Sequence, residues 1–180
     1  KSEEGGYTNR YQWGNNYDYG PSITWMKNNV QDFNRWDMAS EQMKYAEVQA
    51  VAGGVTAVQG SPSSGTDSWD SMLSRNVELY NFGQDGMYTC AVCGAADDDY
   101  SGQHLIDKSN AGTLNAWFVH LSEGVDSSSK SEFDALYEKG LIMDETVVIH
   151  GTALDQNQFN LMGETGAGLV WSPFSNLVLY

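Results

Sequence analysis

Short apolar segments rich in β-branched residues alternate along this chain with longer segments of helical periodicity. Residues 87–93, 114–120 and 146–150 are such apolar segments, and a helical stretch precedes each of them. Strands that are apolar throughout are typical of sheets covered on both faces, and strands joined through helices run parallel. The sequence therefore predicts an α/β fold built on a parallel sheet.

Five helix–strand units are expected in the 180 residues. The first 22 residues, rich in Tyr, Asn and Gly, are expected to form an irregular aromatic loop, so residues 1–37 are loop and helix and residues 38–180 are repeated units. Helices are expected from Ser22 toward Gly53 and at 69–80, 103–110, 131–139 and 156–162, and strands at 55–59, 87–93, 114–120, 146–150 and 168–172. The core is expected to contain Val55, Ala57, Val92, Phe118, Val147, Ile149, Leu169 and Val170.

No phosphate-binding glycine pattern follows any of these strands, which favours a barrel over a nucleotide-binding sheet. A complete (β/α)8 barrel needs about 250 residues, more than this chain contains. The fold prediction is therefore a partial (β/α)8 TIM-type barrel of about five parallel strands with intervening helices.

Charge and composition limit the classes of partner that this protein is expected to bind. Nine basic and 24 acidic residues give a net charge of −15, which argues against binding to nucleic acid or to an anionic membrane surface. With 41% hydrophobic residues and no run of about 18 apolar positions, the chain is expected to be soluble, and a small molecule is the expected partner. The sequence favours neither a cytoplasmic nor an exported protein.

The two cysteines, Cys90 and Cys93, form a C-x-x-C pattern within an expected buried strand. A core role is favoured for them, because no second C-x-x-C completes a zinc site and no thioredoxin-like βαβ context surrounds them. A redox protein is the weakest of the functions considered.

Three titratable residues close consecutive expected strands: His120, Glu123 and His150. In parallel α/β barrels the loops after the strands build the active site, so polar residues at these positions are candidates for catalysis. Glu123 lies three residues after His120, where its carboxylate could act as a base on water held by the imidazole. A single histidine at a strand end can also simply hydrogen-bond to the backbone. Two histidines at the ends of neighbouring strands, with a Glu three residues after the first, favour a functional site. His104 lacks such context and is expected on the surface.

Three segments together resemble successive motifs of the amidohydrolase superfamily. They are Val119-His-Leu-Ser-Glu-Gly124, Val147-Val-Ile-His-Gly-Thr-Ala-Leu154 and Gly168-Leu-Val-Trp-Ser-Pro-Phe-Ser-Asn-Leu177. The branch of triazine hydrolases and guanine- or cytosine-type deaminases is the most similar, and residues 48–59 resemble the early helix-glycine-strand segment of the family.

The resemblance implies a hydrolase that cleaves or deaminates a C–N bond by attack of a metal-activated water. His120 would be a metal ligand, Glu123 the proton shuttle, and His150 a ligand or a donor to the water or substrate. Ser175 and Asn176 match a Ser-Asn pair of the family, which is expected to form loop or pocket structure. Zinc is the expected ion, with iron as the alternative.

Parts of the family's ligand set are absent from this chain. The His-x-His of the first strand has no counterpart, and the metal-binding Asp of the last strand would lie beyond Tyr180. We therefore expect a central fragment, inactive alone, whose other ligands come from the rest of the polypeptide, or a homo-oligomer that covers its sheet edges. The alternative is a non-catalytic structural or assembly fragment of the same fold.

Overall fold

The computed structural model describes residues 6–58, 73–76, 87–91 and 99–180. The chain forms two compact units. The first combines Lys1–Asn15 with Gly86–Tyr180, and the second is Asn16–Asp85.

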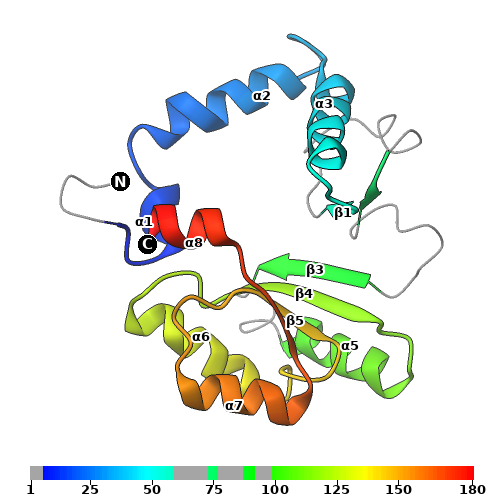
Figure 1. Ribbon diagram of the computed structural model, residues 1–180, viewed down its shortest axis with the longest axis vertical. Coiled ribbons are helices and arrows are strands. Elements are labelled where there is room, and N and C mark those ends of the chain that lie inside the picture. Colours follow the sequence, from blue (N-terminus) through cyan, green and yellow to red (C-terminus); the bar gives the residue numbers. More distant parts are fainter. Residues whose placement is uncertain (1–5, 59–72, 77–86, 92–98) are drawn as a thin grey trace. The chain divides into compact units, whose positions relative to one another are not determined.

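The first unit is a parallel sheet with connecting helices (Figure 1). In chain order its elements are α1 (Arg10–Gly14), β3 (Met87–Ala91), α5 (Asp99–Asn110), β4 (Ala116–Leu121), α6 (Ser127–Glu138), β5 (Thr146–His150), α7 (Gln156–Thr165), β6 (Gly168–Val170) and α8 (Pro173–Leu179). The strand order is β3-β4-β5-β6, and α5, α6 and α7 lie on one face of the sheet. Parallel strands alternating with helices are thus present, and the described strands do not close into a barrel.

Local signals in the sequence set the limits of the helices. Asp126 caps α6 by accepting a hydrogen bond from the Ser129 N–H, and Asp155 forms a capping box with Gln158 at the start of α7. Gly166 ends α7 with a left-handed φ of 83°, a conformation that costs glycine little. With these caps α7 begins at Gln156 as expected, whereas α6 begins at Ser127 rather than at the expected Ser131.

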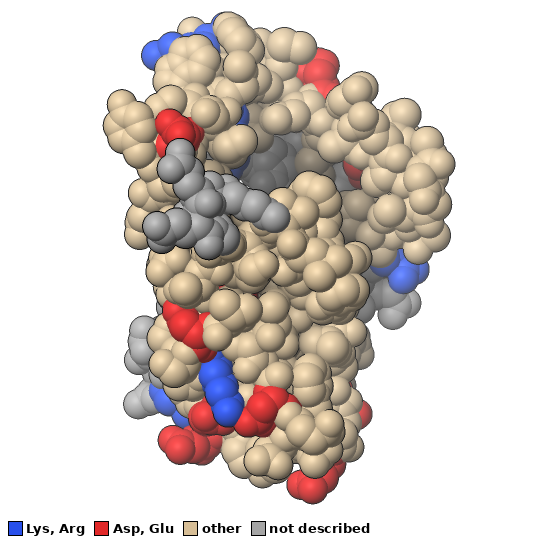
Figure 2. Space-filling view, turned by 60° about the vertical axis from the view of Figure 1, so that its left-hand side comes forward, with Lys and Arg blue, Asp and Glu red and all other residues tan. Residues whose placement is uncertain are grey.

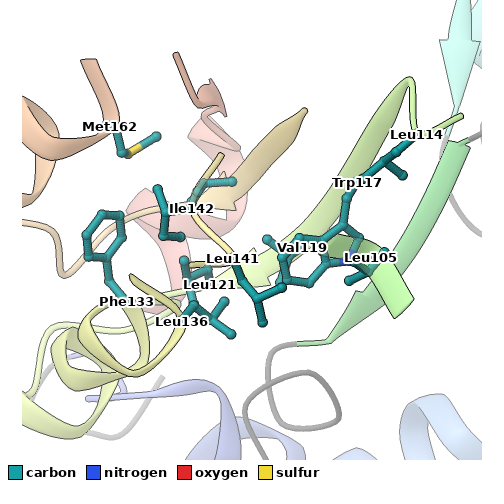
Figure 3. Packing of buried hydrophobic residues seen from close by; sticks show 11 residues of the cluster. Leu105, Leu114, Trp117, Val119, Leu121, Phe133, Leu136, Leu141, Ile142 and Met162 are labelled. Atoms are coloured by element: carbon teal, nitrogen blue, oxygen red, sulfur yellow. The ribbon is translucent and has the colours of Figure 1, made fainter. Parts of the chain in front are cut away.

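The core lies between the sheet and its helices (Figure 3). Trp117 and Val119 of β4 and Val148 of β5 are at most 1% exposed, and they pack with Phe133 and Leu136 of α6. The register pairs Val119 with Val148, so the alternating side chains of β4 and β5 present one continuous apolar face to the helices. Burying that face stabilises the unit by the hydrophobic effect.

The opposite face of the sheet is less deeply buried. Phe118 and Val147 are partly exposed, whereas Ile149 is buried as expected. Leu169 and Val170 are 43% and 44% exposed, so their prediction as core residues is wrong. The reason is their place in β6, which pairs only with β5 among the described strands. The expected strand 168–172 also ends earlier, at Val170.

The second unit contains a π-helical turn (Gly20–Thr24), α2 (Trp25–Gln31), α3 (Ala39–Ala52), and the paired two-residue strands β1 (Ala57–Val58) and β2 (Arg75–Asn76). The helix expected from Ser22 to Gly53 is therefore wrong between α2 and α3. There the carbonyl and carboxylate of Asp32 accept hydrogen bonds from the N–H groups of Arg35 and Asn34, a turn that ends α2.

Other expectations for this part of the chain are also corrected. The helix expected at 69–80 is wrong at Arg75–Asn76, which is strand, and residues 69–72 and 77–80 lie outside the described residues. Val55 and Ala57 are exposed rather than core; Val55 precedes β1, and β1 pairs only with β2 among the described strands. α1 and the π-helical turn replace part of the expected N-terminal loop. Val92 and Cys93 lie outside the described residues, while Cys90 lies in β3.

The net charge of −15 is spread thinly over the face of the molecule that Figure 2 shows. On the face in Figure 2 most atoms belong to uncharged residues, and acidic groups lie in separate small patches. Among the described residues, no helix is both long and apolar enough to cross a membrane.

Two leucines in strands provide a test of this core. Leu121 in β4 is 0% exposed and Leu169 in β6 is 43% exposed. Leu121→Ala should lower the free energy of unfolding by about 2–5 kcal/mol, because it leaves a cavity in a packed core. Leu169→Ala, the same chemical change, should cost less than about 1 kcal/mol. Urea unfolding measures both, and equal losses would contradict the burial described here.

Candidate active site at the carboxyl ends of β4 and β5

His120 and His150 come together at the carboxyl end of the sheet. His120 is the fifth residue of β4 and His150 the last of β5, and the register pairs Leu121 with His150. The two imidazole rings have centroids 5.4 Å apart and are tilted by 47°. The proximity expected from consecutive parallel strands is therefore present.

The backbone turns sharply where both strands end. His150 has a φ of 77° and Ser122, directly after β4, a φ of 55°. Regular alternation would place the His150 side chain on the same face as Val148, toward the helices. The left-handed conformation breaks that alternation and allows the ring to lie beside His120, at a cost of about 1–3 kcal/mol for a residue other than glycine.

Asn176 of α8 fixes the orientation of His150. Its side-chain N–H group donates to the His150 carbonyl oxygen (3.2 Å), so its Oδ1 faces the ring and lies 2.8 Å from His150 Nδ1. An amide oxygen only accepts, so Nδ1 must carry a proton and donate it. In a neutral His150 ring the lone pair is therefore on Nε2.

The carboxylate of Glu123 lies opposite that lone pair. His150 Nε2 and Glu123 Oε2 are 3.5 Å apart, and both side chains are less than a tenth exposed. A lone pair facing a carboxylate in a poorly solvated site is repulsive. The arrangement is favourable when a proton or another cation lies between the two groups, which makes this a site for proton transfer or cation binding.

The other oxygen of Glu123 is held by Tyr180, which is itself held by Trp13. The Tyr180 hydroxyl donates to Oε1 (2.8 Å), and the Trp13 indole N–H donates to the Tyr180 oxygen (2.9 Å). Burial raises the pKa of Tyr180 well above its usual range, and the neighbouring Glu123 carboxylate raises it further. Tyr180 was missed in the sequence because nothing in its neighbourhood marks it, and Trp13 was assigned only to an aromatic loop.

The N-terminal segment also braces the end of β4, another feature missed in the sequence. The Arg10 guanidinium donates to the His120 carbonyl oxygen (3.0 Å) and to Glu132 (2.9 Å). Glu132 accepts a further bond from the Ser122 N–H (2.8 Å). Burial raises the pKa of Glu132, although the Arg10 charge acts in the opposite direction.

The N-terminal segment packs closely against Gly124 in the loop after β4. Gly124 forms an antiparallel bridge with Asn9, and a Cβ at this position would collide with the Thr8 carbonyl oxygen and the Ser129 hydroxyl. Only glycine lets the N-terminal segment lie this close to the loop after β4.

Ser175 and Asn176 have different places in the site. Both lie in α8, so the expectation of loop structure is wrong. Asn176 is buried and holds His150, whereas the Ser175 hydroxyl donates to the Ser172 carbonyl within its own helical turn. His104 is exposed on α5, away from the site, as expected.

The histidine pair fits part of a metal site. Two imidazoles sharing one tetrahedral ion at metal–nitrogen distances of about 2.0–2.1 Å would have centroids about 5 Å apart, close to the 5.4 Å observed. The bare Nε2 of a neutral His150 is the nitrogen a metal requires. In the described part of the chain, however, no three His, Cys, Asp or Glu side chains form a metal-binding group.

The orientation of His150 can be tested directly. In its neutral form His150 should carry its proton on Nδ1, because Asn176 accepts that hydrogen bond. Asn176→Leu removes the acceptor, and the proton should shift toward Nε2, where Glu123 can accept it. Long-range ¹H–¹⁵N NMR of the three imidazoles reports the tautomer, with exposed His104 as internal control. A His150 tautomer unchanged by Asn176→Leu would contradict the role of Asn176.

Comparisons with known proteins add no assignment to this site. No protein-family model, curated protein or solved structure matches the chain. The chemistry open to the site follows from its own geometry: two neighbouring imidazoles and one carboxylate, with the His150 ring held by Asn176 and the Glu123 carboxylate by Tyr180.

Proposed function

We propose that the chain carries part of the active site of a metal-dependent hydrolase that cleaves or deaminates C–N bonds, of the amidohydrolase kind. The observation that carries the proposal is the meeting of His120, Glu123 and His150 at the carboxyl ends of adjacent parallel strands. Active sites of parallel α/β barrels are built at that end. The motif resemblance, which includes these three residues, supports the same chemistry.

We also propose that the first unit is a sector of a (β/α)8 barrel. Its strands follow one another in chain order, and the helices joining them lie on one face. Doubly wound sheets instead reverse their strand order and place helices on both faces. A sheet wound in one direction is the geometry from which a barrel closes, and further strands would continue it beyond β3 and β6.

His120 and His150 would hold the divalent ion, zinc by preference and iron as the alternative. Asn176 supports this assignment, because its bond to Nδ1 leaves Nε2 of His150 available as a ligand. Since catalytic zinc usually has three protein ligands, further ligands must come from outside the described residues, in our proposal from the rest of a longer polypeptide. The ion would supply Lewis-acid activation of water and substrate.

The position of Glu123 supports its assignment as the proton shuttle. Its Oε2 faces the space beside His150, while Oε1 is occupied by the Tyr180 hydroxyl. In hydrolysis Glu123 takes a proton from the attacking water and returns it to the leaving nitrogen, so the carboxylate is regenerated. His150, when its Nε2 is protonated or ligated, compensates the charge of the buried carboxylate between these steps.

Metal content separates this function from a non-catalytic fragment of the same fold. We expect the full-length protein to bind one divalent ion per site, and His120→Ala to lose it because a direct ligand is removed. Asn176→Leu should weaken Zn²⁺ binding by about 10–100-fold, as removal of a partner of a ligating histidine commonly does. His104→Ala is the matched control and should bind as wild type. Wild-type protein without a bound ion after Zn²⁺ loading would favour the non-catalytic alternative.

The role of Glu123 gives a second test. Glu123→Gln keeps the size of the side chain but cannot accept a proton, so kcat should fall by about 10²–10⁴ with metal content unchanged. Ammonia release from cytosine, guanine and melamine by the full-length protein is the assay. Wild-type turnover in Glu123→Gln would show that Glu123 moves no proton.

A further inference from the structure

The two oxygens of the Glu123 carboxylate have different surroundings. Oε1 accepts the hydrogen bond of the Tyr180 hydroxyl at 2.8 Å, and Oε2 lies 3.5 Å from His150 Nε2. The Tyr180 oxygen in turn accepts the indole N–H of Trp13 at 2.9 Å. The two hydrogen bonds from Trp13 to Tyr180 and from Tyr180 to Glu123 therefore end on one carboxylate oxygen. The other oxygen of the carboxylate faces His150.

We propose that Tyr180 is a positioning residue for Glu123, with Trp13 acting through it, and that this pair presents Oε2 alone to the reacting groups. The inference rests on the proposed function insofar as it concerns catalysis. It goes further by assigning a role to two aromatic residues outside the three motifs of the resemblance. Tyr180 contacts Glu123 directly and Trp13 contacts Tyr180, so both are assigned to act through Glu123.

The direction of the hydrogen bonds is fixed by the chemistry of the groups. An indole N–H can only donate, so the Tyr180 oxygen must accept from Trp13 and its own proton is left for Glu123. The raised pKa of Tyr180 keeps that proton in place. The bond to Oε1 holds the orientation of the carboxylate, with one oxygen toward Tyr180 and the other toward His150. Loss of such orientation can cost up to about 10²-fold in rate even when the reacting groups themselves are unchanged.

A purely structural role is the competing explanation. The same aromatic pair joins the N-terminal segment to α8, where the Tyr7 N–H also donates to the Leu179 carbonyl oxygen. In Figure 1, α1 and α8 lie next to each other at this point. A structural role predicts lower stability with no selective change in kcat and no dependence of Trp13 on Glu123.

The first measurement needs no substrate. The six tryptophan indole N–H groups give separate NMR signals, and Trp13→Phe identifies the signal of Trp13. Tyr180→Phe and Glu123→Ala should both shift that signal, the latter because Tyr180 loses the acceptor that orients it. Tyr137→Phe, a tyrosine of α6 stacked on Phe133, is the matched control and should leave it unchanged. A Trp13 signal insensitive to Glu123→Ala overturns the proposed chain of bonds.

The second measurement is kinetic, on the full-length protein with the ammonia-release assay. Tyr180→Phe should lower kcat by about 10–100-fold with KM changed less than about twofold. Trp13→Phe should have a smaller effect, and the double variant should equal Tyr180→Phe because Trp13 acts only through Tyr180. The positioning role is overturned if Tyr180→Phe keeps the wild-type kcat, or if the losses of kcat in the two single variants add up in the double variant. Either result leaves the proposed hydrolase function unaffected.

Failure of the function itself gives a different result. If the wild-type protein releases no ammonia from cytosine, guanine or melamine, the proposed hydrolase function is contradicted. The catalytic part of this inference is then contradicted as well. The NMR measurement then still decides whether Trp13 and Tyr180 orient Glu123. Unfolding midpoints of all variants separate either outcome from a loss of folded protein.

Discussion

The buried carboxylate of Glu123 is the constraint around which this end of the molecule is arranged. A charge removed from water is costly unless hydrogen bonds and an opposite charge compensate it. Tyr180 satisfies one oxygen and His150 faces the other, and both of these groups have partners of their own in Trp13 and Asn176. Residues from α1, the loop after β4, β5 and α8 are thus tied together by one side chain.

The parts of the fold that could be predicted from the sequence are those set by local patterns. β4 and β5 follow from short β-branched segments, and α6 and α7 from periodicity and caps. The proximity of His120 and His150 follows as well, because consecutive parallel strands end at the same edge. The exposure of Leu169 could not be predicted this way, since burial depends on which elements cover β6 rather than on its own residues.

The partners of the site illustrate the same limit. Trp13, Tyr180 and Arg10 reach Glu123 and His120 through contacts between distant parts of the chain, and no periodicity encodes such contacts. Asn176 was noticed only through motif resemblance, and its bond to His150 depends on α8 returning over the strand ends. The left-handed backbone of His150 has no sequence signal either, because it occurs at a residue other than glycine.

The brace formed by Arg10 has a consequence for the order in which the protein folds. Arg10 and Glu132 are separated by 122 positions, whereas the bonds within and between β4, α6, β5 and α7 join residues much nearer in sequence. Closing a long loop costs entropy that local contacts do not, so contacts of high sequence separation tend to form late. The sheet and its helices can therefore assemble first, with the histidine pair still open to solvent. The N-terminal segment, which brings Arg10 and Trp13 to the site, would then arrive late, so that the ordering of this site follows that of the sheet.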